Sequence, residues 1–317
     1  THTHTHTHTQ PHTHTHTQPV LAKEDMPEYM DVVGRSVRRD GGDKCWETVF
    51  NATETMAQML ALGPPGEEEL MKHFQACEPM TALNAATFVG DAMGSLQGAV
   101  QGNHIYADGN MTTISIMCGL IESKAANHSL DALLPLLPEM NNRTKCRDNS
   151  YEKALKQLQN TSWGESMDRQ WTWQTCNEFG FFQTAGSIES PFHPLASVLD
   201  LQYYRTLCQD AYSLPSTQNF SVPTSFTNSF YGGRSLGASR VVLPDGSVDP
   251  WHSLALTEPL TPLQTALNIT PVFIDGTTHC GDMRYPQEGD LASLQAAHAQ
   301  IAATVASWLP PRPIRQS

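Results

Sequence analysis

The sequence predicts an α/β protein: a mainly helical first half, then a fragment of a doubly wound α/β sheet. Three observations predict it. Apolar residues recur at helical spacing through residues 24–137. Short apolar runs at 240–243 and 271–275 are each followed by a turn that contains glycine. A final segment carries one apolar stripe. With 317 residues and 39% hydrophobic residues, the chain can form one large domain or two ordinary ones.

Helices are expected wherever Gly, Pro or Asn divides the first half into periodic segments. These segments are 28–37, 44–62, 67–77, 83–101, 112–122 and 129–140. Methionine is frequent within them, at Met56, Met59, Met71, Met93 and Met117. A methionine-lined substrate channel is conceivable. We favour methionines that fill irregular gaps between packed helices, since their flexible side chains suit that role.

The pattern changes from about residue 141. A helix is expected at 150–160, and an aromatic-rich stretch follows at 171–184, with Glu178 expected to be a buried carboxylate. The strands at 240–243 and 271–275 come next. In the closing helix the apolar positions of one stripe are Leu291, Leu294, Ile301, Val305 and Trp308.

The N-terminal 18 residues repeat Thr-His, broken by Gln-Pro. Histidines two residues apart could chelate transition metals weakly. A CA-dinucleotide repeat translated in frame explains the pattern better, so we interpret residues 1–22 as a non-native low-complexity tract. It has almost no apolar side chain to bury and is expected to be disordered. We exclude it from the fold prediction.

Charge and cysteine content indicate the compartment. The net charge of −13 argues against nucleic acid or an anionic membrane as a partner, and no apolar run approaches the roughly 18–20 residues that span a bilayer. The chain has 7 cysteines without a zinc-type spacing, which favours disulfides and one remaining thiol, Cys280, and we expect no metal or other cofactor. Asn-x-Ser/Thr sequons predict a glycosylated lumenal protein, secreted or in lysosomes or endosomes; they occur at Asn51, Asn110, Asn127, Asn142, Asn160, Asn219 and Asn268.

Asp249 and His279 are the candidate catalytic residues. Each follows one of the two predicted strands, and the acid precedes the base by 30 residues, enough for one crossover helix. Alone, Asp249 would be an ordinary turn residue before Pro250, and His279 an ordinary loop histidine. Their joint order after consecutive strands predicts the acid and the general base of a hydrolase triad.

A nucleophile is harder to place. The pattern Gly-x-Ser-x-Gly occurs at Gly233-Arg234-Ser235-Leu236-Gly237. A nucleophile elbow needs a strand before the serine and a helix directly after it. Here a polar, glycine-rich segment precedes Ser235 and a predicted strand follows, so we interpret Ser235 as a turn residue.

At these residues the chain resembles a family of serine peptidases that comprises lysosomal Pro-Xaa carboxypeptidase, a proline-preferring dipeptidyl peptidase and thymus-specific serine protease. The resemblance covers roughly residues 25–309, and the thymus-specific branch matches best. The matching motifs are Trp171-x-Trp173-Gln174-Thr175-Cys176-x-Glu178-Phe179-Gly180, Tyr231-Gly232-Gly233, Asp245-Gly246-Ser247-Val248-Asp249-Pro250-Trp251 and Gly276-x-x-His279-Cys280-x-Asp282-Met283.

The resemblance implies the C-terminal part of an α/β-hydrolase domain with a helical cap, the cap at 23–140 and the hydrolase half at 141–317. It implies triad roles for Asp249 and His279 and the disulfides Cys45–Cys118, Cys77–Cys146 and Cys176–Cys208. A second cysteine that the carboxypeptidase has shortly after the position of Cys176 is absent. In the family the nucleophilic serine precedes the segment that aligns with residue 25, so we expect these 317 residues alone to be inactive.

The expected activity is that of a serine exopeptidase that acts on peptides, either a carboxypeptidase or a dipeptidyl peptidase, with a preference for proline. A homodimer is a possible oligomeric state. Trp173, Glu178 and Trp251 are candidate substrate-binding residues. Glu178 could hold a substrate amine or accept local backbone hydrogen bonds. The alternative function is a non-catalytic truncated or pseudogene product that acts at most as a binding module.

Overall fold

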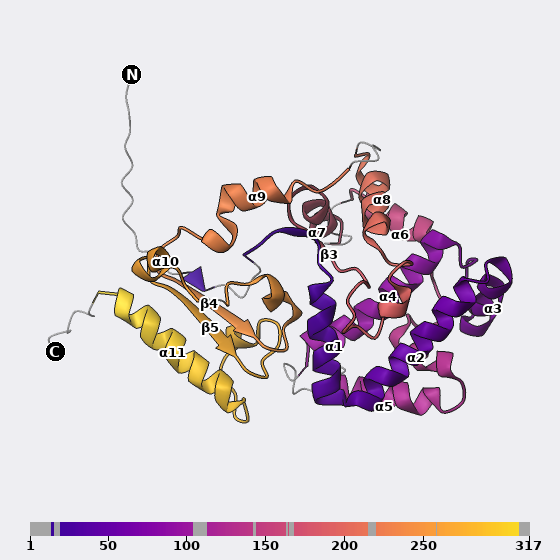
Figure 1. The fold of residues 1–317 in the computed structure, drawn as a ribbon, viewed down its shortest axis with the longest axis horizontal. Coiled ribbons are helices and arrows are strands. Elements are labelled where there is room, and N and C mark those ends of the chain that lie inside the picture. Colours follow the sequence, from indigo (N-terminus) through magenta and orange to yellow (C-terminus); the bar gives the residue numbers. More distant parts are fainter. Residues whose placement is uncertain are drawn as a thin grey trace, which may run out of the picture.

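Helices make up most of the computed structural model. Helices α1 to α6 (residues 28–159) lie at one end of the molecule, and a small parallel sheet with the long helix α11 (Ala292–Trp308) lies at the opposite end (Figure 1). The structure describes residues 14–15, 20–103, 113–141, 144–162, 164, 168–214, 220–257 and 259–310. The predicted mixed α/β class is confirmed at this level. Residues 1–13 and 16–19 of the Thr-His tract lie outside the described residues. The expected disorder was wrong for His14–Thr15, which form strand β1, and for residues 20–22, whose N–H groups donate to Leu254 and Asn228.

The helical part contains the elements predicted from apolar spacing. They are α1 Glu28–Gly41, α2 Asp43–Leu60, α3 Pro64–Phe74, α4 Ala82–Gln101, α5 Ile114–Ala125 and α6 Tyr151–Gln159. The apolar faces of α1 to α5 form one core, in which Met56, Met93 and Met117 are buried. Met59 and Met71 pack against it. The gap-filling role predicted for the methionines is therefore confirmed.

One predicted helix differs in type. Residues Ser129–Leu136 form a 3₁₀ helix, η1, where a longer helix over 129–140 was expected. Pro135 lies inside it and has no N–H to donate, so a regular α-helix cannot continue there. The side chain of His128 caps its start by accepting a hydrogen bond from the N–H of Leu130. This segment packs against α2 and α5.

Three disulfides hold the helical part and its neighbours together. The bonds are Cys45–Cys118, Cys77–Cys146 and Cys176–Cys208, the pairs that the family resemblance implies. The first joins α2 to α5, and the second joins the chain after α3 to the loop before α6. Disulfides persist in oxidising compartments, so this pattern is typical of proteins of the secretory pathway. Cys280 is in no disulfide.

The aromatic stretch folds into three short pieces: helix α7 (Asp168–Gln174), the π-helix η2 (Thr175–Phe179) and strand β3 (Gly180–Phe182). Strand β3 pairs in parallel with β2 (Lys23–Asp25). The prediction that Glu178 is buried was wrong: its side chain is exposed, because it lies on the outer side of the π-helix turn while Thr175 and Cys176 face inward.

The main sheet has the predicted order of strand, loop acid, helix, strand and loop base. Strands β4 (Val241–Gly246) and β5 (Ile269–Ile274) pair in parallel, and α10 (Pro262–Ala266) lies in the crossover between them. Strand β1 (His14–Thr15) pairs with the other edge of β4. Six residues of β4 are all buried, as expected of a strand covered on both faces.

The closing helix α11 (Ala292–Trp308) lies along one face of this sheet (Figure 1). Leu294 is buried against Val242, Val272 and Ile274, and Ile301, Val305 and Trp308 pack around them. Leu291 was predicted in the same stripe, but it precedes the helix and its side chain is 41% exposed. The residue is the N-cap, whose extended backbone turns the side chain off the helical face.

The remaining helices connect these parts. They are η3 (His193–Leu195), α8 (Leu201–Tyr212), α9 (Thr224–Tyr231), η4 (Gly233–Ser235), η5 (Pro250–Leu254) and η6 (Gly281–Met283). The apolar core of the helical part continues through Phe192, Leu195, Val248 and Trp251, so residues on both sides of the predicted boundary at 140 share it.

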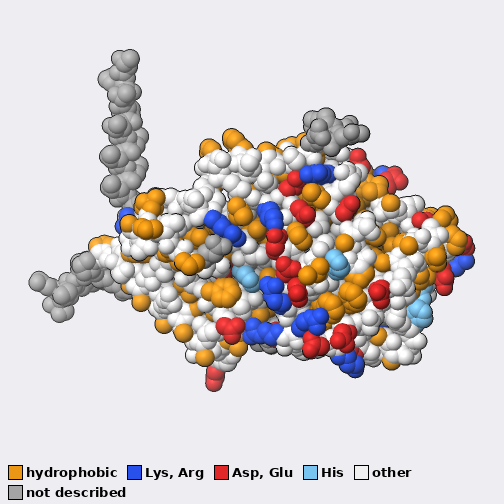
Figure 2. Space-filling view, viewed as in Figure 1, with side chains coloured by type: hydrophobic (Ala, Val, Ile, Leu, Met, Phe, Trp, Pro, Cys, Tyr) orange, Lys and Arg blue, Asp and Glu red, His pale blue; other side chains and the backbone are white. Residues whose placement is uncertain are grey.

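The surface shows mixed charge. In Figure 2 acidic and basic side chains are interleaved over the middle of the molecule, without a large patch of one sign on this face. None of the helices within the described residues is long and apolar enough to cross a membrane. The sequon asparagines Asn51, Asn127, Asn160 and Asn268 are exposed, and Asn110, Asn142 and Asn219 lie outside the described residues.

Candidate active site: the Asp249–His279 pair

Asp249 lies in the turn that follows β4. Its backbone is extended, and its side chain caps η5 by accepting a hydrogen bond from the N–H of Trp251 at 2.9 Å. Pro250 occupies the first position of this short helix. A backbone N–H at that position would have no partner within the helix, so the missing N–H of proline costs no hydrogen bond. The carboxylate is only 1% exposed. The turn residue and the buried acid are therefore the same residue, and the cap fixes one of its oxygens.

His279 lies in the corresponding turn after β5 and directly follows the buried residues Thr277 and Thr278 in the chain. Its Nδ1 atom is 3.0 Å from Oδ2 of Asp249. A carboxylate only accepts hydrogen bonds, so Nδ1 carries the proton and donates it. When the ring is neutral its lone pair is therefore on Nε2, and the side chain is 28% exposed. The structure thus brings together the two residues that the sequence singled out.

Backbone contacts hold the two turns against each other. The N–H of Ser247 donates to the carbonyl of Ile274, and that of Val248 donates to the carbonyl of Thr277, each at 3.0 Å. Gly246 makes this approach possible: a Cβ atom there would lie 2.1 Å from the carbonyl oxygen of Thr277. Only glycine leaves room for a backbone at that distance.

Opposing effects act on the imidazole of His279. Burial lowers its pKa, but the hydrogen bond to Asp249 and the interaction with Cys280 outweigh burial and raise the pKa above its ordinary value. The nearby carboxyl groups are affected in the same direction. Burial, with the charges of Asp249 and Asp282, raises the pKa of Asp245 to about 8. Burial chiefly, with a smaller contribution from Asp249, raises that of Asp282 to about 6.

Aromatic rings surround the pair. Trp251 is 9% exposed, and its ring centroid is 6.4 Å from that of His279. Edge-to-face contacts join Trp251 to Tyr29 at 5.2 Å, to Phe181 at 5.4 Å and to Trp171 at 6.0 Å. Such contacts fix ring orientations beyond simple apolar burial.

A cavity of 590 Å³ opens beside these rings, with a mostly apolar lining that includes Trp171, Phe179, Phe181 and Tyr231. Trp171 and Phe181 therefore contact both the cavity and Trp251. Sequence reasoning did not select either residue, although both lie in the aromatic stretch. No periodic pattern would have revealed them, because Trp171 is 49% exposed on α7 whereas Phe181 is buried on β3.

The other two substrate-binding candidates lie differently. The ring of Trp173 is 44% exposed and meets Tyr212 of α8, with centroids 5.1 Å apart. Glu178 is exposed, and its backbone carbonyl accepts a hydrogen bond from Thr227. Of the three candidates, Trp251 is the one that the structure places beside His279.

Ser235 lies in η4, with α9 before it and β4 after it. Its side chain is exposed. The serine of a nucleophile elbow follows a strand and opens a helix, whereas here a helix precedes and a strand follows. The local structure matches the interpretation of Ser235 as a turn residue.

The arrangement so far defines a class of protein: an α/β protein with a buried carboxylate and a histidine presented after neighbouring parallel strands. Residues 15–301 match the model of the family described as serine carboxypeptidase S28. The chain belongs to this family of serine peptidases, which makes it a hydrolase by family.

Individual relatives agree. The chain is 30% identical over 306 residues to the thymus-specific serine proteases of Mus musculus and of Homo sapiens, which covers 92% of the chain and 57% of each relative. It is 31% identical over 106 residues to a protein of Arthroderma benhamiae named "Probable extracellular serine carboxypeptidase", covering 32% of the chain and 13% of that protein. The chain thus spans little more than half the length of the two thymus-specific relatives.

Proposed function

We propose that this chain supplies the acid and the base of a serine exopeptidase, with Asp249 as the orienting carboxylate and His279 as the general base. The observation that carries the proposal is the 3.0 Å contact between Nδ1 of His279 and the buried carboxylate of Asp249. Family membership supports the reaction class, because serine peptidases need such a pair to activate a hydroxyl nucleophile.

Each residue has a defined step. Nε2 of His279 takes the proton of a serine hydroxyl as its oxygen attacks the substrate carbonyl, and returns that proton to the leaving amine. Asp249 keeps the proton of the ring on Nδ1 and stabilises the imidazolium that forms. A water molecule then attacks the acyl group in the same way, with His279 again as the base, and releases it from the serine. The cap bond from Trp251 keeps the carboxylate in place through both steps.

The surroundings support short substrates with an apolar residue beside the cleaved bond. The cavity next to Trp251 presents the aromatic faces of Trp171, Phe179 and Phe181. An apolar ring such as that of proline buries its surface well against such faces. A helical cap at 23–140 over a hydrolase half at 141–317 would restrict the site to chain ends.

A lumenal location, secreted or in lysosomes or endosomes, fits the disulfides and the exposed sequons. We propose that the protein is glycosylated at those asparagines; the mass lost on enzymatic removal of N-glycans tests this. Glycans need a hydrated surface, and all four described sequon asparagines are exposed.

The test uses a polypeptide that carries these residues together with a nucleophilic serine. We expect it to cleave peptides with proline at the second position from one end, and blocking either the amino or the carboxyl end decides between the two exopeptidase types. Asp249→Asn should lower kcat by about 10⁴-fold, because the ring is then held in the wrong tautomer. Asp275→Asn is the matched control: this carboxylate follows β5, as His279 does, and its side chain is 83% exposed.

Two outcomes would contradict the proposal. One is unchanged turnover in the Asp249→Asn variant, and the other is cleavage inside long folded substrates with neither end required. We expect the 317 residues alone to give no turnover, since Ser235 lacks the strand and helix of an elbow. Turnover by this chain that Ser235→Ala abolishes would assign the nucleophile to Ser235 instead.

A further inference from the structure

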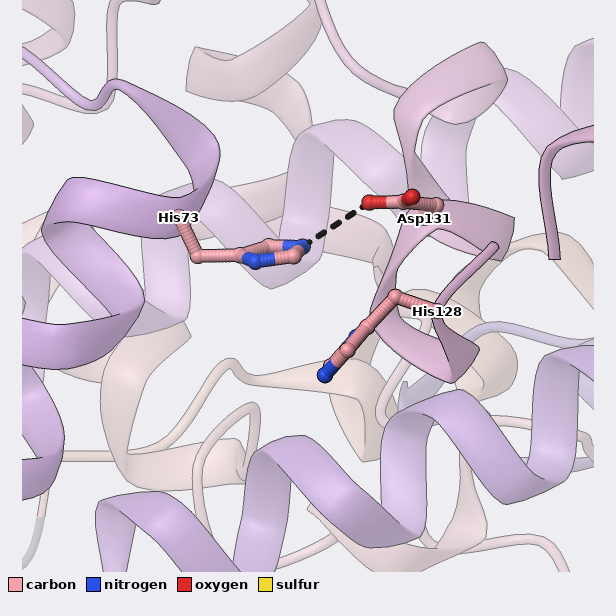
Figure 3. A group of neighbouring side chains, drawn as sticks. All are labelled: His73, His128 and Asp131. Carbon is pink, nitrogen blue, oxygen red and sulfur yellow. Dashed lines mark ion pairs between the residues drawn. The ribbon is translucent and has the colours of Figure 1, made fainter.

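A second group of metal-binding side chains lies in the helical part, away from the Asp249–His279 pair. His73 is in the last turn of α3, His128 precedes η1, and Asp131 lies within η1. One potential ligand atom from each residue lies within 4.8 Å of the others. In Figure 3 the ring of His73 points at Asp131, and the ring of His128 lies beside them. Their distance along the chain hides this group from a search by sequence spacing.

Nε2 of His73 has no satisfied hydrogen bond. This atom is buried and lies 3.0 Å from Oδ1 of Asp131, but it makes no hydrogen bond of acceptable alignment there. A buried polar atom without a partner costs free energy. An electron-pair acceptor between Nε2, the carboxylate and the second imidazole would remove that cost.

We propose that His73, His128 and Asp131 bind one zinc ion. Two imidazoles and a carboxylate are among the donor sets that Zn²⁺ takes, at about 2.0–2.2 Å from each donor. Donors of a tetrahedral ion are then a little over 3 Å apart by the same geometry. The pair His73–Asp131 already has this spacing at 3.0 Å. A modest movement of the exposed His128 side chain completes the set.

The burial pattern suits a site with one open position. The side chains of His73 and Asp131 are 24% and 21% exposed, and His128 is exposed, so water can fill the fourth position. The ion would join the end of α3 to the start of η1. Binding has a local cost, because Nδ1 of His128 accepts a 3.2 Å hydrogen bond from the N–H of Leu130, and an ion at that nitrogen replaces it.

The test measures zinc affinity in the full chain by equilibrium dialysis against zinc chloride. The histidines of the Thr-His tract would add weak binding, so the background variant carries Gln in place of His2, His4, His6, His8, His12, His14 and His16. We expect one zinc per chain, and at least a tenfold loss of affinity in His73→Gln, His128→Gln and Asp131→Asn. His193→Gln is the matched control, a half-buried histidine outside the group.

A second readout keeps the proposal falsifiable if the half-buried His73 variant folds poorly. Zinc should raise the Tm of the background protein more than that of the exposed His128→Gln variant, because binding to the native state alone stabilises it in proportion to affinity. Zinc binding that none of the three substitutions weakens would overturn the proposal. So would the absence of saturable binding in the background protein.

Discussion

Three carboxyl groups lie close to the candidate site, and they are not equivalent. Asp249 contacts His279 and the N–H of Trp251. Asp245 is 2% exposed on β4, and burial, with the charges of Asp249 and Asp282, raises its pKa to about 8. Asp245 therefore holds a proton at neutral pH, which avoids a second negative charge behind the pair.

This difference predicts how stability depends on pH. An aspartate in the unfolded chain ionises near pH 4, so between about pH 4 and 8 native Asp245 holds a proton that the unfolded chain has lost. Stability then falls as pH rises through that window. We expect Asp245→Asn to remove this loss, which is on the order of 1 kcal/mol per pH unit. The measurement is the free energy of unfolding by urea at pH 5 and pH 8.

The variant should gain on the parent protein at pH 8 and match it more closely at pH 5. His279 and Asp282 are present in both proteins, so the comparison isolates the contribution of Asp245. Asp275→Asn, which removes a carboxylate with an 83% exposed side chain, is the control for the loss of one acidic group. An equal difference between Asp245→Asn and its parent at both pH values would show that Asp245 is ionised in the native state.

At the scale of elements, the site depends on the junction of two turns. The turn after β4 carries Asp249, the turn after β5 carries His279, and backbone hydrogen bonds from Ser247 and Val248 join them. The two turns approach each other most closely at Gly246, where the carbonyl of Thr277 occupies the space that a Cβ atom would need. The strands thus set the direction of each side chain, and the glycine sets their separation.

Gly246→Ala should disrupt this junction. A Cβ atom 2.1 Å from the carbonyl oxygen of Thr277 forces the turns apart, and overpacking of this kind costs about 1–3 kcal/mol. In a polypeptide that has the nucleophile, we expect Gly246→Ala to lower both the free energy of unfolding and the peptidase activity relative to the parent protein. Gly237→Ala is the control, since nothing lies within 4 Å of its Cβ position. Equal stability of the two variants would refute the role given to Gly246.

The elements that could be predicted have a strong periodic pattern. Helices α1 to α6, strands β4 and β5, and the order of Asp249 and His279 follow from apolar spacing and turn residues. The 3₁₀ form of η1 was missed, although Pro135 is visible in the sequence. The inward side of the stretch from α7 to β3 was missed because three different backbone geometries in 15 residues leave no period to count.

Contacts between side chains that are far apart in the sequence were harder to predict than the helices and strands. Nothing in the sequence separates Trp171, which reaches Trp251, from Trp173, which meets Tyr212. The meeting of His73 with His128 and Asp131 is equally invisible, because it depends on how α3 packs beside η1. The disulfide pairs came from the family resemblance rather than from the spacing of the cysteines, which permits many pairings.

At the scale of the whole molecule, the two parts share one core. Strand β2 at Lys23–Asp25 pairs with β3 at Gly180–Phe182, and Trp251 packs on Tyr29 of α1. The histidine and carboxylate pair thus rests on the sheet on one side and on α1 through Trp251 on the other. A change in how the helical part packs would move Trp251, and with it the cap of Asp249.

The central claim is that Asp249 and His279 activate a serine. Labelling by a fluorophosphonate probe tests it most directly, in a polypeptide that holds these residues together with the nucleophile. We predict rapid labelling of one serine, slowed at least a thousandfold by His279→Gln and by Asp249→Asn. Asp275→Asn should label at the parent rate. Labelling that neither His279→Gln nor Asp249→Asn slows would contradict the account.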